Sequence, residues 1–173
     1  EIALTVYKVS GETNTDDFSP AKEAWSRPDI PLHAQAFLKW SENISDPLEK
    51  LTELKKDGSK LAFVGDVVGT GSSRKSAVNS MLWHMGDEIP FVPAKKTGGF
   101  CLGNKIAPIF YNTLQDSGAF PVELDVDALE YGRKIILKPY DGQILDATSK
   151  EIITKFDLKS EVIFDEFRAG GRK

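Results

Sequence analysis

Two serines and an arginine, Ser72, Ser73 and Arg74, stand between a strand-like segment and a helix-like segment. The N–H groups at the start of a helix, together with its partial positive charge, attract anions. The guanidinium of Arg74 adds a planar set of donors that matches a carboxylate or a phosphate. These residue types predict an anion site with two hydroxyls beside the ligand, and a serine that only caps the helix is the equally weighted alternative.

The same turn departs from three well-known motifs at a defining position. A nucleotide-binding P-loop needs Gly-Lys-Ser/Thr where residues 70–72 read Thr-Gly-Ser. A dinucleotide-binding turn that begins at Gly69 needs glycine or alanine where Arg74 stands. A hydrolase nucleophile elbow needs glycine where Lys75 stands. The serine is therefore not a typical triad nucleophile, and the arginine favours recognition of a carboxylate.

The flanking residues predict how this turn is held. Residues 61–64 form an unbroken apolar run, as expected for a strand buried on both faces. Gly69 and Gly71 permit the backbone conformations of a tight turn. Apolar residues then recur at helical spacing from residue 77 to residue 85, and Gly86 ends the helix. We therefore predict a buried strand, a glycine-rich turn and an amphipathic helix.

The remaining chain predicts one compact mixed α/β domain over residues 1–173, without repeats or a long linker. Strands are expected at residues 3–9, 91–92, 120–126, 134–138, 143–145 and 151–156. Helices are expected from Asp29, from Asp46 with Glu49 as a capping box, at residues 108–118 and from Ser160. Residues 11–17 and 95–99 read as loops, Pro121 favours a sheet edge, and Asp-Gly at residues 141–142 predicts a hairpin.

The amino-acid composition and net charge exclude several classes of protein. The 173 residues are 40% hydrophobic with a net charge of −4, which argues against nonspecific nucleic-acid binding and against anionic membranes. We see no membrane-spanning run and no signal peptide, and the missing initiator methionine suggests an excerpt of a longer chain. Cys101 is the only cysteine, which fits a reducing, cytoplasmic location and leaves no cysteine-based metal site within this chain. His33 and His84 are expected to pack, and no metal ligands are predicted.

Five segments, in order along the chain, carry a resemblance to a known family. They are residues 11–17, 24–34, 65–77, 105–110 and 168–172, and they include Gly-Ser-Ser-Arg at 71–74 and Trp-Ser-Arg at 25–27. This set resembles the aconitase family, and within it the swivel domain of the bacterial B branch. Many aconitases have glutamate after Ser-Ser-Arg, whereas this chain has Lys75, as the B branch does.

The resemblance implies a three-layer β/β/α swivel domain, a mixed sheet with flanking helices, that packs over an iron–sulfur core. It implies the interconversion of citrate and isocitrate through cis-aconitate, with a [4Fe–4S] cluster ligated by cysteines outside this segment. The isolated domain is then expected to be inactive. By resemblance, Ser72 is the base, Arg27, Gly71, Ser73 and Arg74 bind substrate, and Asp16 and Thr70 support the site.

Other functions stay open at this point. The chain is alternatively the small subunit of an isopropylmalate isomerase-type dehydratase, because those subunits share the serine-arginine turn. An aconitase of this branch also has 2-methylisocitrate as a candidate substrate. Messenger RNA is a possible partner of the cluster-free protein, although Lys95, Lys96, Arg172 and Lys173 form only a small basic set. The last alternative is a carboxylate-binding module without chemistry.

Overall fold

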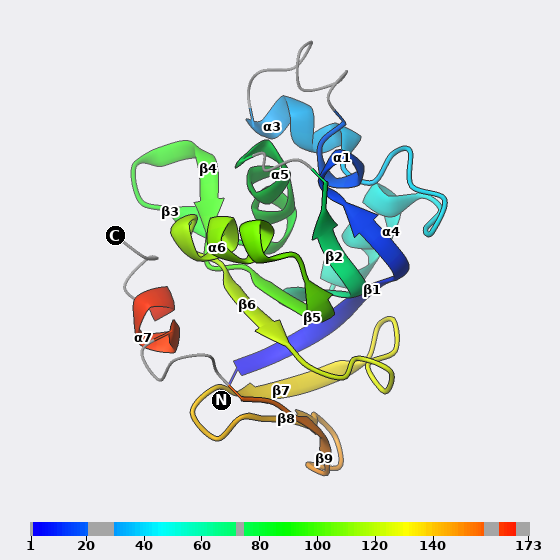
Figure 1. The fold of residues 1–173 in the computed structure, drawn as a ribbon, viewed down its shortest axis with the longest axis vertical. Coiled ribbons are helices and arrows are strands. Elements are labelled where there is room, and N and C mark those ends of the chain that lie inside the picture. Colours follow the sequence, from blue (N-terminus) through cyan, green and yellow to red (C-terminus); the bar gives the residue numbers. More distant parts are fainter. Residues whose placement is uncertain (1, 21–29, 72–74, 158–162, 169–173) are drawn as a thin grey trace.

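The computed structural model describes residues 2–20, 30–71, 75–157 and 163–168, and its centre is a seven-stranded mixed sheet (Figure 1). The strand order is β6-β5-β2-β1-β7-β8-β9, and a separate hairpin pairs β3 with β4. The strands are β1 (Ile2–Asn14), β2 (Leu61–Thr70), β3 (Asp87–Ile89), β4 (Val92–Thr97), β5 (Phe100–Ile106), β6 (Phe120–Glu123), β7 (Lys134–Lys138), β8 (Gln143–Asp146) and β9 (Ile152–Lys155). The first strand of the chain is therefore the middle strand of the sheet.

Strands β1, β2, β5 and β6 are parallel and follow one another across the sheet in chain order. Crossover connections between parallel strands are nearly always right-handed, so strands in this order carry their connecting helices on one face. Those helices are α1 (Thr15–Phe18), α3 (Ile30–His33), the 3₁₀ turn η1 (Ala34–Ala36), α4 (Pro47–Lys55), α5 (Lys75–Met85) and α6 (Pro108–Asp116). Figure 1 shows them together on the side of the sheet away from β7–β9.

The antiparallel strands β7, β8 and β9 supply the other layer. β7 pairs with β1, and apolar residues of β7 and β8 join those of the parallel strands in one buried cluster. Its members include Val6, Val64, Leu102, Phe120, Ile135, Leu137 and Ile144. Because strands at both ends of one sheet share this core, the sheet folds over itself. Helices, parallel strands and antiparallel strands thus form the predicted β/β/α layers, with α7 (Ile163–Arg168) beside β6.

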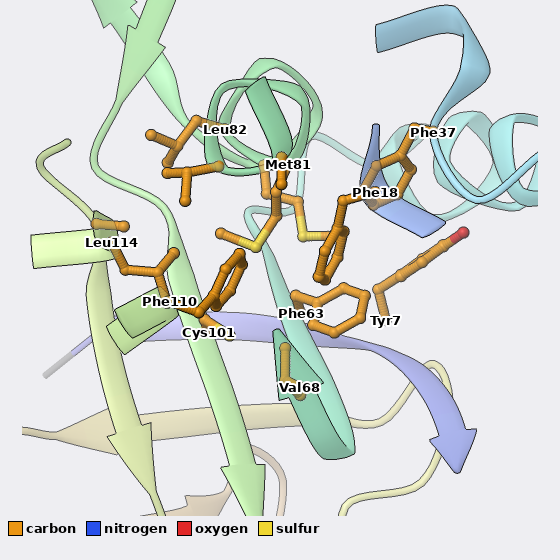
Figure 2. Packing of buried hydrophobic residues seen from close by; sticks show 14 of the residues in the cluster. Tyr7, Phe18, Phe37, Phe63, Val68, Met81, Leu82, Cys101, Phe110 and Leu114 are labelled. Atoms are coloured by element: carbon orange, nitrogen blue, oxygen red, sulfur yellow. The ribbon is translucent and has the colours of Figure 1, made fainter. Parts of the chain in front are cut away.

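A second buried cluster lies between the helices and the parallel strands (Figure 2). Its centre is aromatic: the ring of Phe18 stacks on Phe110 at 5.4 Å between centroids and meets the edge of Phe63 at 5.0 Å. Met81 and Leu82 of α5 pack onto the same cluster from above the sheet. Phe18 therefore anchors the short helix α1 to the core, although α1 has only four residues.

Several predicted elements are confirmed. Helix α5 ends at Met85, directly before Gly86, and α6 begins at Pro108. The Asp-Gly turn joins β7 to β8 as an antiparallel hairpin. Strand β6 with Pro121 lies at one edge of the sheet, as that proline predicted.

Other predictions were wrong, mostly at strand ends. Residues 11–17 are not a loop, because β1 runs to Asn14 and α1 follows at once. Strand β2 continues through the glycine-rich segment to Thr70. Strand β5 was not predicted, and Lys95 and Lys96 lie in β4 and not in a loop. Asp46 precedes α4 without a side-chain cap. The predicted caps Asp29 and Ser160 lie outside the described residues.

Candidate functional site

The candidate site lies where β1 and β2 end side by side. Asn14, the last residue of β1, is the register partner of Thr70, the last residue of β2. Parallel strands present their carboxyl ends at the same edge of a sheet, and ligands of α/β proteins commonly bind there. Each strand also leads toward a helix, since α1 begins at Thr15 and α5 at Lys75. This edge therefore collects two strand ends and two helix starts.

The start of α1 is built by a reciprocal pair of hydrogen bonds. The side-chain oxygen of Asn14 accepts from the N–H of Asp17 at 2.8 Å, and the carboxylate of Asp17 accepts from the N–H of Asn14 at 2.9 Å. Such a capping box satisfies two N–H groups that the first helical turn leaves without a partner. Together with the buried ring of Phe18, it fixes the turn that carries the exposed Asp16.

Gly71 brings the second strand end against this turn. Its φ of +98° is in a region that side-chain-bearing residues rarely adopt. A Cβ atom added there would lie 3.3 Å from the hydroxyl oxygen of Thr15. Both the backbone conformation and the close approach therefore call for glycine. Gly71, which directly follows the last residue of β2, thus lies right beside the first turn of α1.

Two hydrogen bonds that involve side chains join β1 and β2 near the site. The hydroxyl of Thr70 donates to the carboxylate of Glu12 at 2.6 Å, and the N–H of Gly11 donates to the carboxylate of Asp66 at 2.8 Å. Both bonds join β1 to β2 through a side chain, in addition to the main-chain ladder. Thr70 is thus held by a side-chain hydrogen bond as well as by its strand pairing.

The described part of the site is negatively charged. Burial raises the pKa of Asp17, and the neighbouring charges of Asp16 and Glu12 raise it further, against the opposing effect of the Asn14 N–H. An anion bound at this edge would meet these carboxylates and would need cationic partners. The predicted partners are Arg27 and Arg74.

Three predicted site residues are brought together, and four lie outside the described residues. Thr70 and Gly71 lie beside α1, which carries Asp16. Arg27, Ser72, Ser73 and Arg74 fall in residues 21–29 and 72–74, which the structure does not describe. Sequence reasoning missed the contribution of Asn14 and Glu12. The Asn14-x-x-Asp17 spacing directly before the apolar Phe18 could have revealed the capping box, whereas nothing in the sequence pairs Glu12 with Thr70.

Within residues 2–20, 30–71, 75–157 and 163–168, no group of three or more histidine, cysteine, aspartate or glutamate side chains is arranged to hold a metal ion. Cys101 is buried, and burial raises the pKa of its thiol, which disfavours the thiolate needed for ligation. His84 packs against Phe37, as expected for a packing histidine. Over the same ranges, no helix is long and apolar enough to span a membrane. The described residues therefore do not fit a cluster site of their own.

The chain matches known proteins over nearly its whole length. A family model described as "Aconitate hydratase 2 N-terminus" matches residues 4–173. Proteins named "Aconitate hydratase B" from Salmonella typhimurium and Escherichia coli are 56% and 54% identical, each over 99% of this chain and 21% of the relative. The one from Synechocystis is 58% identical over 99% of this chain and 19% of the relative. The chain thus spans about a fifth of the length of these curated relatives.

A solved structure has the same fold. The crystal structure of a 3-isopropylmalate dehydratase from Methanocaldococcus jannaschii superposes with a TM-score of 0.70. It covers 99% of this chain and 90% of the other, at 18% sequence identity. At that identity the likeness is one of fold alone.

Proposed function

The chain belongs to the family of aconitate hydratase 2 N-terminal domains, and from that premise we propose that it is the swivel domain of an aconitate hydratase. The observation that carries the proposal is the identity of 54–58% to proteins named aconitate hydratase B across 99% of the chain. The whole enzyme would interconvert citrate and isocitrate through cis-aconitate. This domain, over residues 1–173, would supply the base and cationic side chains that grip carboxylates.

Each proposed role follows from the chemistry of the residue. Ser72 removes a proton from a substrate carbon and returns it. Arg74 and Ser73 hold one substrate carboxylate at the start of α5, and Arg27 holds another. A tricarboxylate brings three negative charges, so planar guanidinium groups that bind carboxylates through two hydrogen bonds suit it. Thr70 and Gly71 set the position of the turn, and Asp16 belongs to the surrounding polar network.

A serine is a weak base unless its surroundings change its acidity. The start of a helix contributes at most about 2 kcal/mol. At about 1.4 kcal/mol per pKa unit, that lowers a hydroxyl pKa by roughly 1.5 units, which is too little to ionise serine at neutral pH. The remainder must come from Arg74, further N–H donors and a closed, water-poor site. We therefore expect the isolated domain to be inactive.

The [4Fe–4S] cluster that the resemblance implies would be ligated outside this segment, because the described residues offer no ligand set for it. In the family it supplies a Lewis-acidic iron for the substrate hydroxyl. The other domains of the same enzyme would be the principal protein partner, and a cytoplasmic location is part of the same proposal. The likeness to the dehydratase small subunit supports that alternative only as a related fold. Messenger RNA is not proposed as a partner, because neither the matches nor the net charge of −4 favours it.

The test is Ser72→Ala in the full-length protein that carries this chain. We expect turnover of citrate to be lost while the absorption and EPR spectra of the cluster are unchanged, because only the base is removed. Ser76→Ala makes the same change four residues later in α5 and is the matched control, with turnover near that of the wild type. Near-normal turnover of Ser72→Ala with an intact cluster contradicts the proposal.

A further inference from the structure

Two register shifts lie at the site end of the parallel β1–β2 pair. The register is regular from Thr5 opposite Leu61 to Val9 opposite Gly65. Between Val9 and Glu12, β1 then holds one residue more than β2, and β2 holds one residue more where Gly69 follows Val68. The two extra residues compensate, so that Asn14 and Thr70 end opposite each other.

An extra residue in one strand changes the direction of the side chains that follow it. Here the register shifts change which residue of β2 the Glu12 side chain contacts. The Cα register partner of Glu12 is Val67, yet its carboxylate accepts a hydrogen bond from Thr70, three residues further along β2. The side chain of Glu12 therefore runs along the neighbouring strand toward the strand end.

Glu12 is held at its main chain as well. The side-chain amide of Asn43 donates to the carbonyl oxygen of Glu12 at 3.0 Å. The preceding Gly11 donates its N–H to Asp66 and lies against Asn43, whose amide would be 3.4 Å from an added Cβ. Contacts on both sides thus fix the main chain from which the Glu12 carboxylate extends.

The position of this carboxylate indicates what it does. A negative charge repels an anionic substrate, so Glu12 does not suit direct recognition of a tricarboxylate. Its hydrogen-bond donor, Thr70, directly precedes Gly71 and stands two residues before Ser72. We propose that Glu12 is a positioning residue that acts through Thr70 to fix the end of β2, from which the chain continues through Gly71 toward the proposed base Ser72. This inference rests on the proposed function.

The main test measures kcat and KM for citrate in the full-length protein. We expect Glu12→Ala to lower kcat by about 10- to 100-fold, because a displacement of about 1 Å in a reacting group can cost that much. We expect KM to change by less than about threefold, since the arginines are untouched. Glu12→Gln keeps an oxygen that accepts from Thr70, so its kcat should stay within about threefold of the wild type.

The control removes a matched hydrogen bond elsewhere. The hydroxyl of Tyr140 donates to the exposed carboxylate of Asp165 at 2.6 Å, joining the β7–β8 turn to α7. Asp165→Ala therefore breaks a bond of the same chemistry and length on elements that do not form the site. We expect it to leave kcat unchanged. Equal losses of kcat in Asp165→Ala and Glu12→Ala would show a general effect on stability and overturn the inference.

A double variant tests the route through Thr70. If Glu12 acts by holding this hydroxyl, Glu12→Ala combined with Thr70→Val should lower kcat no further than the more damaging single variant. Independent, multiplying losses would overturn the inference.

Ser72→Ala, measured in parallel, distinguishes a failure of the positioning role of Glu12 from a failure of the proposed function. Loss of turnover in Ser72→Ala with wild-type kcat in Glu12→Ala refutes the positioning role alone. Full turnover in Ser72→Ala refutes the proposed function, and the positioning role with it.

Discussion

His84 is expected to make this domain sensitive to acid. Its Nε2 lies 2.7 Å from the carbonyl oxygen of Ala34, so the neutral ring donates from Nε2. Burial is the largest cause that lowers the pKa of His84 to about 4; the hydrogen bond to the Ala34 carbonyl opposes it, and the charges of Lys55 and Lys96 act in the same direction as burial. This contact joins α5, which begins directly after residues 72–74, to η1.

The size of the stability loss in acid follows from the pKa of His84 in the unfolded chain and in the folded chain. An unfolded histidine titrates near pH 6.5, whereas the folded His84 stays neutral until about pH 4. Between these values the unfolded chain binds one proton more than the folded chain, so the free energy of unfolding falls as the pH falls. The loss is about 1.4 kcal/mol per pH unit, or about 3 kcal/mol over the interval.

The assay compares the urea unfolding of the wild-type 173-residue chain with that of His84→Gln. The measurements run from pH 7.5 to pH 4.5, roughly the range over which a histidine titrates. Glutamine can donate to the Ala34 carbonyl but does not titrate, so the variant should lose stability less steeply in acid. Carboxyl groups titrate in both proteins, and their effects cancel in the difference. His33→Gln removes the chain's other histidine and should keep the steep dependence. Identical slopes for wild type and His84→Gln would refute the assignment of acid sensitivity to His84.

Two further predictions concern the site. Gly69 has a φ of +84°, and alanine in that conformation should lower the free energy of unfolding by about 1–2 kcal/mol. The new Cβ would also lie 2.2 Å from the Phe110 ring, and this overlap should cost about 1–3 kcal/mol more. The control is Gly58→Ala, because Gly58 has a φ of +78° and an added Cβ there would have nothing within 4 Å. This variant should show only the cost of the backbone conformation in the same urea-unfolding assay. Equal losses of stability in the two variants would contradict this reasoning. Arg27→Lys in the full-length protein should mainly raise KM for citrate, because a point charge cannot reproduce the guanidinium fork. Unchanged KM and kcat would contradict the role proposed for Arg27.

Local sequence patterns correctly predicted those helices and turns whose ends are set by a nearby proline or glycine. Proline at the first position starts α4 and α6, and Gly86 follows the end of α5. Asp-Gly at residues 141–142 predicted the β7–β8 hairpin, because this dipeptide suits the turn itself. In these cases the residue and its neighbours contain the whole physical reason.

The missed features depend on distant partners. Strand β5 contains Gly103, Asn104 and Lys105, which obscure any strand pattern, yet it forms hydrogen bonds with β2 on one side and β6 on the other. The polar end of β1 is a strand because β2 pairs with it. At the site, the motif predicted a carboxylate-binding turn, but the contact between Glu12 and Thr70 needs both strands and the register shifts between them. Tertiary pairing thus overrides local propensity at these positions.

The central place of β1 in the sheet has a consequence for biosynthesis. Ile2 pairs with Leu137 and Thr5 with Leu61, so the two neighbours of β1 emerge from the ribosome at very different times. At about 5–20 residues per second, β7 follows β1 by roughly 7–27 s. During that interval one edge of an apolar strand has no partner and can pair with another chain. We therefore expect the nascent domain to be prone to aggregation until β7 is made, and a chaperone that covers this edge to raise its folding yield.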